Sequence, residues 1–322
     1  MAVSLLLPRR VGCWGRLGLI IYFAVLLPLR LSIAQGCSDA GLCSIPDLKP
    51  PDVESVNLPA TNRVAIGLTF GQGDESVSTL TPYVSYERSL TGRLFLAAKL
   101  TYNSAFGELG DYAGLGDMYV SGGYVLHRTN VNEWSVMLGG KVPLSSADGG
   151  DDANALPMDY QASLDSYDLL LGCSYRQSAF SAHIGLQLPM SGENSSTFLA
   201  NQYPDPRAQN YSSTNRYVRR GDALLRIAYQ LSAAGNRLTI KPSLLPIYHL
   251  GEDAYTNRSG EEIAIAGSQG LTLNVNVFAA MKINRRQALE LMIGMPLVTR
   301  DVRPDGLTRS VVAGLEYRIA FN

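Results

Sequence analysis

The sequence predicts an all-β protein, a closed antiparallel up-and-down transmembrane β-barrel of about twelve strands that follows a cleaved signal peptide. Three observations lead to this prediction. Strand-like runs alternate between apolar and polar or small residues, short and long connections alternate between the runs, and aromatic residues of the apolar face gather at the run ends. The 322 residues are 46% hydrophobic, only 17% charged and carry a net charge of −1, which argues against a disordered chain and against nucleic-acid binding.

The chain begins with the features of an export signal. Arg9, Arg10 and Arg16 precede an apolar core at 17–27 and a small-residue cleavage site, so residues 1–34 are predicted to be a signal peptide. Residues 35–62 are rich in proline and are expected to form a periplasmic segment, either a lead-in or a plug that enters the lumen.

The cysteines are interpreted from the exported location. Cys37 and Cys43 lie close together, and in an oxidising compartment this spacing predicts a local disulfide, with metal binding as the alternative. Cys13 is removed with the signal peptide. Cys173 is then unpaired, and it falls on a position that is predicted to face lipid.

Residues 63–322 are predicted to form the barrel. Connections near 90–91, 127–131, 177–178, 232–235 and 284–286 are short, whereas those near 104–114, 144–165, 191–220, 250–268 and 298–308 are long. A membrane barrel has tight turns at one end and longer loops at the other, which a soluble β-sandwich does not require. The predicted strands are 63–72, 78–89, 92–103, 115–126, 132–143, 166–176, 179–190, 221–231, 236–249, 269–283, 287–297 and 309–321.

The two faces of these strands differ as a membrane wall requires. In 92–103, 179–190 and 269–283 the apolar face carries no formal charge, so we expect it to contact outer-membrane lipid. Aromatic residues at run ends fit girdles at two membrane interfaces, whereas soluble β-proteins bury aromatics in strand middles. They are Tyr124, Trp134, Tyr175, Phe180, Tyr229, Tyr317 and Phe321 beside short turns, and Tyr102, Tyr167 and Tyr248 beside long loops.

The inward face is predicted to carry charges of both signs. These charges form either cross-strand ion pairs or a site for a polar solute. Small inward residues are expected to leave space for passage, and the mixed lining suits an amphipathic or aromatic solute better than free ions. The lumen candidates are Asp117, Tyr119, Lys99, Lys141, Asp168, His183, Arg226, Lys241, Phe278 and Glu290.

Two long loops have features of their own. Residues 144–165 contain five aspartates, which predicts a solvated outer loop, with divalent-cation binding as the alternative. Residues 191–220 are polar and are expected to fold inward as a lid or to contact surface polysaccharide. Neither a metal-ligand set nor a cofactor is assigned from the sequence.

Two segments resemble known barrels. The last strand carries an aliphatic or aromatic residue at every second position up to Phe321 and resembles the C-terminal assembly signal of bacterial outer-membrane barrels, although Asn322 follows it. This resemblance implies recognition by the barrel-assembly machinery. Residues 114–120 (GLGDMYV) resemble a Gly-x-Gly-Asp strand start of barrels related to the meta-pathway phenol-degradation transporter, and more loosely of the long-chain fatty-acid transporter class. The resemblance implies uptake of hydrophobic or aromatic small molecules across the bacterial outer membrane.

Three functions are compared. The leading hypothesis is a passive outer-membrane channel for small, hydrophobic or aromatic solutes, and the second is a non-conducting structural or surface-interaction barrel. The third, an outer-membrane lipid hydrolase, requires a His and a Ser together on the lipid face. His183 is predicted to point inward, and neither a nucleophile elbow nor zinc-ligand spacing is present, so we expect no enzymatic activity.

Overall fold

The computed structural model of the chain describes residues 61–322, with gaps at 152–153, 236 and 307–309. The predicted signal peptide, almost all of the 35–62 segment and the predicted Cys37–Cys43 pair lie outside the described residues. Cys173 is a free cysteine. In the described part, helices are too short or too polar to cross a membrane.

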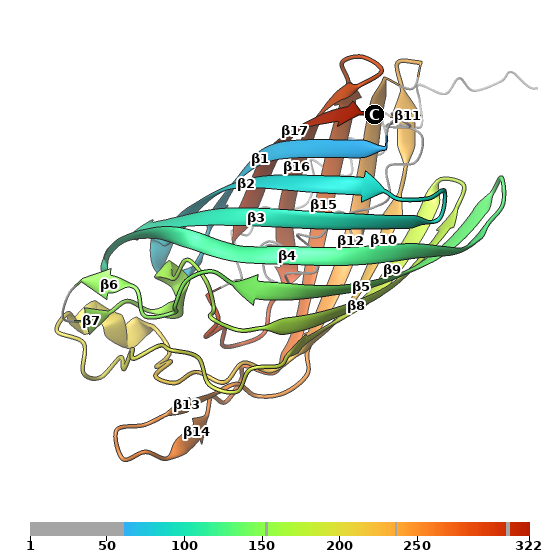
Figure 1. Cartoon of the computed structure of the whole chain (residues 1–322). Coiled ribbons are helices and arrows are strands. Elements are labelled where there is room, and N and C mark those ends of the chain that lie inside the picture. The colour runs from blue at the N-terminus through green and yellow to red at the C-terminus, as the bar shows by residue number, and fades with distance from the viewer. Residues whose placement is uncertain (1–60, 152–153, 236, 307–309) are drawn as a thin grey trace, which may run out of the picture. The chain divides into compact units, whose positions relative to one another are not determined.

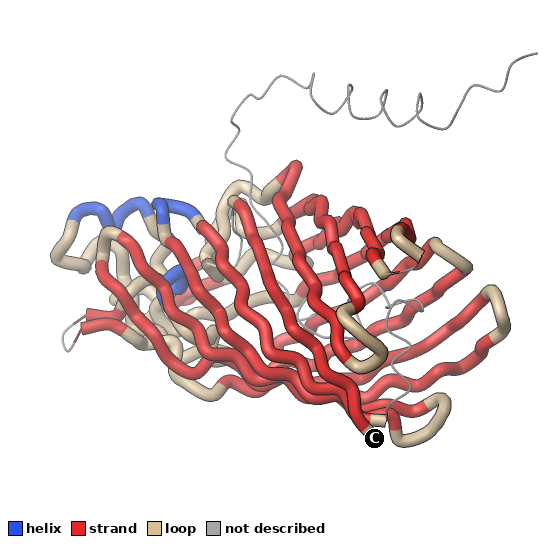
Figure 2. The backbone as a smooth tube through the Cα atoms, turned by 90° about the horizontal axis from the view of Figure 1, so that it is seen from above, coloured by secondary structure: helices blue, strands red, loops and turns tan. Residues whose placement is uncertain are grey.

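Twelve antiparallel strands close into a barrel, which confirms the predicted fold class (Figures 1 and 2). The wall consists of β1 (Asn62–Gln72), β2 (Ser78–Ser89), β3 (Leu94–Gly107), β4 (Gly110–Arg128), β5 (Asn132–Pro143), β8 (Asp168–Gln177), β9 (Phe180–Pro189), β10 (Asp222–Tyr229), β12 (Leu238–His249), β15 (Gly270–Lys282), β16 (Gln287–Val298) and β17 (Val311–Phe321). Pairing of β1 with β17 closes the sheet, and the short strand β11 (Leu231–Ala233) continues the edge of β10 against β12.

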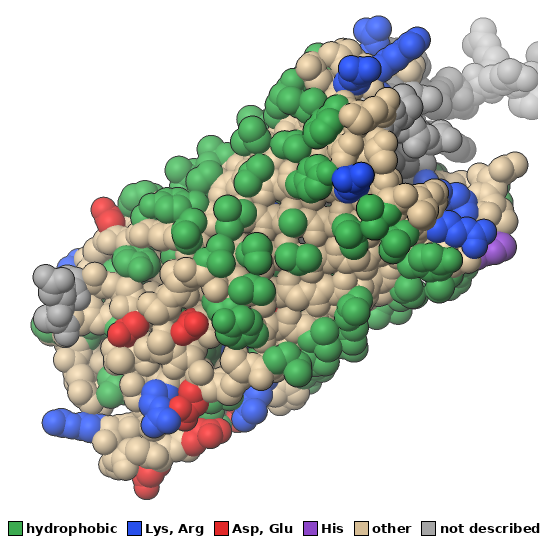
Figure 3. Space-filling view, in the orientation of Figure 1, with side chains coloured by type: hydrophobic (Ala, Val, Ile, Leu, Met, Phe, Trp, Pro, Cys, Tyr) green, Lys and Arg blue, Asp and Glu red, His purple; other side chains and the backbone are tan. Residues whose placement is uncertain are grey.

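Side-chain alternation produces a wall with two different faces. In β9, Phe180 and Ile184 are exposed on the outer face. His183 and Gln187 of the same strand are buried on the inner face. Figure 3 shows the exposed apolar side chains spread along the wall, with most charged side chains near its two ends. Such an apolar outer band is the surface that hydrocarbon requires. Trp134 and Tyr175 stack beside a short turn with ring centroids 4.5 Å apart, as expected for an interfacial girdle.

The connections sort by length largely as predicted, with one error. Short turns at 90–93, 129–131, 178–179 and 283–286 oppose long loops at 144–167, 190–221, 250–269 and 299–310. The predicted long loop at 104–114 is wrong, because β3 and β4 continue through it and pair from Leu94 to Gly107. Outer loops cover this extension, so Ala105 is buried there without any lipid contact.

The long loops contain short elements of their own. These are the 3-10 helices η3 (Met158–Tyr160) and η4 (Pro206–Asn210), and the hairpins formed by β6 (Gly150–Asp151) with β7 (Asn154–Ala155) and by β13 (Ala254–Thr256) with β14 (Glu262–Ala264). A third 3-10 helix, η2 (Asp74–Ser76), lies in the short connection between β1 and β2. A hydrophobic cluster holds the loops together, and we name it the loop core: Val77, Ala105, Leu156, Tyr160, Phe198, Ala208 and Tyr211.

Two inward glycines do not leave the open space that was expected of small inward residues. A Cβ atom on Gly67 would lie 2.2 Å from the Tyr83 ring, and one on Gly123 would lie 2.0 Å from the Phe95 ring. Each glycine is therefore covered by an aromatic ring from the neighbouring strand. Apolar inward residues also fill part of the lumen, where they form one cluster: Met137, Leu170, Leu224, Leu245 and Ile247, with Tyr119 against it.

Candidate functional site

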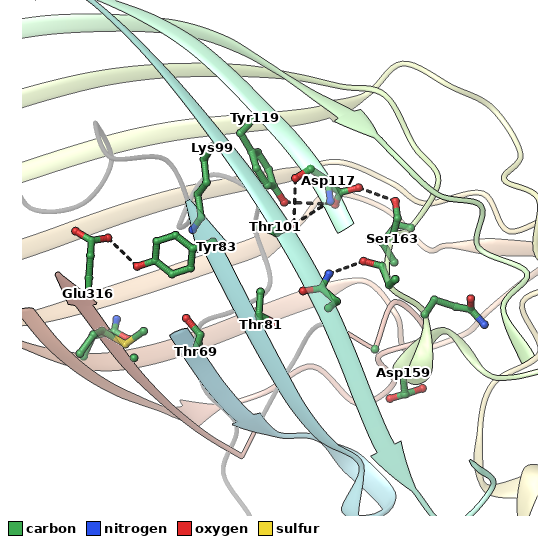
Figure 4. Close-up of a pocket in the computed structure, with 18 of the residues that line it drawn as sticks. Thr69, Thr81, Tyr83, Lys99, Thr101, Asp117, Tyr119, Asp159, Ser163 and Glu316 are labelled. Atoms are coloured by element: carbon green, nitrogen blue, oxygen red, sulfur yellow. Dashed lines mark hydrogen bonds between the residues drawn. The ribbon is translucent and has the colours of Figure 1, made fainter. Parts of the chain in front are cut away.

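A cavity of about 150 Å³ lies inside the barrel (Figure 4). One side of it is the inner face of the wall, and the other side is a stretch of the long loop between β5 and β8. The wall residues that line it are Thr69, Thr81, Tyr83, Lys99, Thr101, Asn103, Asp117, Tyr119, Arg226, Asn276, Phe278, Glu290, Met292, Gly314 and Glu316. Met158, Asp159, Gln161, Ala162, Ser163, Leu164 and Gly306 complete the lining.

The loop stretch at residues 156–165, which we name the inward segment, is attached to the wall at two points. Asn103 donates a hydrogen bond from its amide to the carbonyl oxygen of Ala162. Ser163 donates from its hydroxyl to Asp117 at 2.6 Å. Both wall residues face the lumen, so these bonds hold the segment inside the barrel (Figure 4).

Packing fixes the rest of the inward segment. Tyr160 is fully buried in the loop core, where its hydroxyl lies 3.3 Å from that of Tyr211. Gly306 of the last long loop has φ +60, and a Cβ there would lie 2.4 Å from the Cα atom of Asp159. Only glycine permits both this left-handed conformation and this close approach. The segment is therefore held from the loop side as well as from the wall.

Charged and aromatic side chains interact on the wall side of the cavity. Tyr83 donates to Glu316 at 2.7 Å, and Arg318 pairs with the same carboxylate at 2.6 Å. The Lys99 ammonium lies 3.8 Å from the centroid of the Tyr83 ring, which is a cation–π contact. Figure 4 shows the two side chains next to each other. The Arg226 guanidinium lies 5.7 Å from the centroid of the Phe278 ring.

Polar residues form a belt on the inner face toward the long-loop end. Lys141 lies between two carboxylates, 3.1 Å from Asp168 and 3.9 Å from Asp117. Gln187 donates to Asp168 from the next strand and is opposite Asp222 in the register. The belt thus runs over neighbouring strands from β4 to β10, and its charged side chains are almost entirely buried.

Loop residues extend this belt into what we name the mouth cluster: Arg219, Asp222, His249, Asp253, Arg300 and Asp305. His249 lies between two carboxylates, with its ring nitrogens 2.7 Å from Asp222 and 2.8 Å from Asp253. Arg300 pairs with Asp305 at 2.6 Å, and Arg219 contacts the same carboxylate at 3.3 Å. Three long loops therefore meet at one buried ion-pair network.

Electrostatics in the loops follow from this arrangement. Burial alone would raise the pKa of Asp305, but the guanidinium groups of Arg300 and Arg219 outweigh it and hold that pKa well below its usual range. Burial raises the pKa of Tyr217, and the carboxylates of Asp253 and Asp305 raise it further. Tyr217 therefore stays neutral and donates to Asp253 at 2.7 Å.

The structure brings some of the predicted lumen residues together. Those that line the cavity are Lys99, Asp117, Tyr119, Arg226, Phe278 and Glu290. Lys141 and Asp168 lie in the polar belt, and Lys241 is buried opposite Phe278 in the register. Their role in binding a solute stays a prediction.

His183 forms a pair that the sequence did not indicate. Its Nδ1 atom lies 2.7 Å from the Ser174 hydroxyl, and its Nε2 atom has no hydrogen-bond partner among the described residues. The pair faces the lumen and has no carboxylate on the second nitrogen to orient the ring. The arrangement thus lacks the third member that activates a serine nucleophile.

The inward segment is the part of the site that the sequence interpretation missed. Residues 144–165 were expected to be a solvated acidic loop, yet Leu156, Met158, Tyr160 and Leu164 are buried. These apolar residues are the sequence feature that could have predicted a buried segment, because a solvated loop does not require them. Asp148 accepts hydrogen bonds from Thr197 instead of lying free, and no group of three or more metal-binding side chains is found in the described residues.

Of the comparisons with known proteins, the one with solved structures found similar folds. No protein-family model and no curated protein matches the sequence. Among solved structures, the COG4313 outer membrane channel from Pseudomonas putida F1 is similar over 81% of this chain and 96% of its own, with a TM-score of 0.59 and 14% identity. The KdgM porin and the NanC porin match 80% of this chain and 99% of their own, with TM-scores of 0.41 and 0.44 at 9% and 8% identity. The likeness to the first of these structures shows the fold, a closed antiparallel β-barrel.

Proposed function

We propose that the chain is a bacterial outer-membrane channel through which small solutes pass passively. The observation that supports this proposal is the position of the cavity, which lies inside the barrel between the wall and the inward segment. A solute that moves along the lumen meets this site. The inward segment narrows the passage there, so it sets an upper limit on solute size.

We propose further that the channel favours solutes with an apolar or aromatic face. Tyr83, Tyr119 and Phe278 provide rings in the lining, and Met158 and Met292 provide thioethers. The acidic residues of the same lining are opposed by basic ones, which gives no strong preference for ions of one sign. A mixed lining of this kind suits small amphipathic molecules better than bare ions.

Solute entry into proteoliposomes tests the channel proposal. Liposomes that contain the full-length mature chain are diluted into isosmotic solutions of neutral solutes of increasing size, and their swelling rate is measured. We expect entry of solutes up to about the size of a monosaccharide and a steep loss above it. Liposomes with heat-unfolded chain provide the control. Swelling no faster than this control for every solute would reject the channel.

A surface-interaction barrel is the second candidate, and the ordered outer loops favour it. The loop core and the mouth cluster give the long-loop end a fixed surface of the kind that a binding partner requires. Replacing residues 257–260 of the β13–β14 hairpin would then abolish binding to cell-surface polysaccharide and leave solute entry intact. A channel without this second role shows no change in either measurement.

We propose no enzymatic activity for the chain. The Ser174–His183 pair faces the lumen, where it does not meet membrane lipid. A lipid-release assay with the reconstituted chain tests this directly, with Ser174→Ala as the matched variant. Fatty-acid release by the parent chain that disappears in this variant would establish a hydrolase.

A further inference from the structure

Asn276 has an unusual environment on the inner face of β15. Its side chain lines the cavity and is only 1% exposed, yet neither the amide nitrogen nor the amide oxygen has a hydrogen-bond partner among the described residues. Its oxygen lies over Gly294, where a Cβ would be 2.3 Å away. A buried amide with both groups unpaired is costly, so a bound molecule is expected to supply a donor and an acceptor.

Two hydroxyl groups face the same cavity from β1 and β2, across the lining from Asn276 on β15. Thr69 and Thr81 are direct neighbours in the register of β1 and β2, and both line the cavity (Figure 4). Neither hydroxyl bonds to another described residue. Gly314 lies between Thr69 and Met292 in the register, so this position adds no side chain to the lining between them.

The carboxylates of the lining already have protein partners. Glu316 accepts from Tyr83 and pairs with Arg318, which also lies 3.8 Å from Glu290. Asp117 accepts from Ser163 and lies 3.9 Å from Lys141. Among the described residues of this lining, the Asn276 amide and the hydroxyls of Thr69 and Thr81 have no hydrogen-bond partner, and all three groups are uncharged.

Uncharged groups that both donate and accept match hydroxyl groups, because each hydroxyl also does both. The Phe278 ring and the Met292 thioether lie in the same lining and offer an apolar surface to the flat side of a ring. The cavity of about 150 Å³ has room for roughly ten water molecules, which corresponds to a single six-membered ring with its substituents.

We propose that this cavity is a binding site for an uncharged six-membered ring compound that carries two or more hydroxyl groups. Asn276 on one side and Thr69 with Thr81 on the other bind the hydroxyls, and Phe278 and Met292 contact the ring. The proposal rests on the channel function for the route by which the solute enters, and it names the solute class. A sugar and a hydroxylated aromatic ring share this chemistry.

Equilibrium binding to the folded chain in detergent micelles tests the site without requiring passage. Titration calorimetry uses glucose for the sugar source and resorcinol for the aromatic source. Glucuronate and glucosamine are charged counterparts of glucose, and the dimethyl ether of resorcinol lacks the donors. We expect saturable binding of glucose or resorcinol at about millimolar concentration, and at least about tenfold weaker binding of the charged or methylated counterpart.

Substitutions locate the site. Asn276→Leu removes both amide groups at similar volume, and we expect it to weaken binding about tenfold. Thr69→Val and Thr81→Val remove one hydroxyl each and should weaken it about threefold. Asn274→Leu is the matched control, because Asn274 is buried on the same face of the same strand but does not line the cavity. Folding of each variant is checked on detergent gels, where the heated, unfolded chain should migrate more slowly than the unheated barrel.

The outcomes separate this site from the channel. Binding that Asn276→Leu weakens and Asn274→Leu spares supports the site, even if liposome swelling shows no passage. Swelling without saturable binding of either probe overturns the site and leaves the channel intact. Equal effects of the two asparagine variants, or equal binding of charged and neutral rings, also overturn the proposed site. The Asn276 amide would then bond only to water.

Discussion

At the residue scale, the inner wall is shaped by pairs of glycine and aromatic residues. Gly67 is opposite Tyr83 in β1 and β2, and Gly123 is opposite Phe95 in β4 and β3. Each ring lies where the Cβ of the opposite residue would be, so the missing side chain is a requirement of packing. The ring of Tyr83 in turn positions its hydroxyl on Glu316.

Replacement of one such glycine measures how closely the ring fits. Gly67→Ala places a methyl group 2.2 Å from the Tyr83 ring, which must move and release Glu316. We expect a loss of about 1–3 kcal/mol in the free energy of unfolding, measured by urea titration in micelles. Gly92→Ala is the control, because nothing lies within 4 Å of that position. Equal stability of the two variants would contradict this packing.

At the element scale, the strands could be predicted from the sequence and the inward segment could not. Each strand carries its own alternation, so residues such as Lys99 and Phe278 were assigned to the inner face without knowledge of their neighbours. The extension of β3 and β4 through 104–114 was missed because loops, and not lipid, cover it.

Contacts between distant segments account for most of what was missed at the site. Asn103 meets Ala162, Tyr160 meets Tyr211, and Asp159 meets Gly306, and none of these pairs is implied by a local pattern. The contact of Asp117 with Lys141 is one of the cross-strand ion pairs expected among the inward charges, because the two residues lie on adjacent strands. The bond from Ser163 to the same aspartate was not expected.

The buried Tyr160 ring is predicted to keep the inward segment ordered. Tyr160→Ala removes a fully buried ring from the loop core, and we expect a local cost of about 3–5 kcal/mol, as for other large-to-small core changes. Amide hydrogen exchange in residues 156–165 should then accelerate, while the wall strands stay protected. Tyr160→Phe keeps the ring and should have a much smaller effect. Unchanged exchange in the alanine variant would show that the wall contacts alone fix the segment.

The mouth cluster predicts an acid-dependent loosening of the outer loops. The pKa of Asp305 is lowered on folding, so its stabilisation is complete above the unfolded value of about 4 and is lost as the pH falls through the lower folded value. Pepsin digestion between about pH 4 and about pH 2 should therefore begin to cut the 299–310 loop only at the acidic end. Asp305→Asn removes the charge and should allow trypsin to cut at Arg303 at neutral pH. Resistance of this variant would exclude the ion pairs as the cause.

At the scale of the whole molecule, the sorting of connections fixes the orientation in the membrane. The long loops are expected to face the cell exterior and the short turns the periplasm. A membrane-impermeant maleimide added to intact cells should label Ser259→Cys, which lies in the exposed β13–β14 hairpin, but not Arg285→Cys, which lies in a short turn. The reverse labelling would place the cavity and its inward segment toward the periplasm.

Single-channel current through the reconstituted chain tests the central claim, that the inward segment narrows a water-filled passage, most directly. The parent chain should give a small, steady conductance. Replacing residues 156–163 with a Gly-Ser linker should raise it about twofold or more, because the main constriction is gone. Replacing residues 257–260 of the outer hairpin should leave it unchanged. Equal conductance in all three proteins, or none in any of them, would contradict the account.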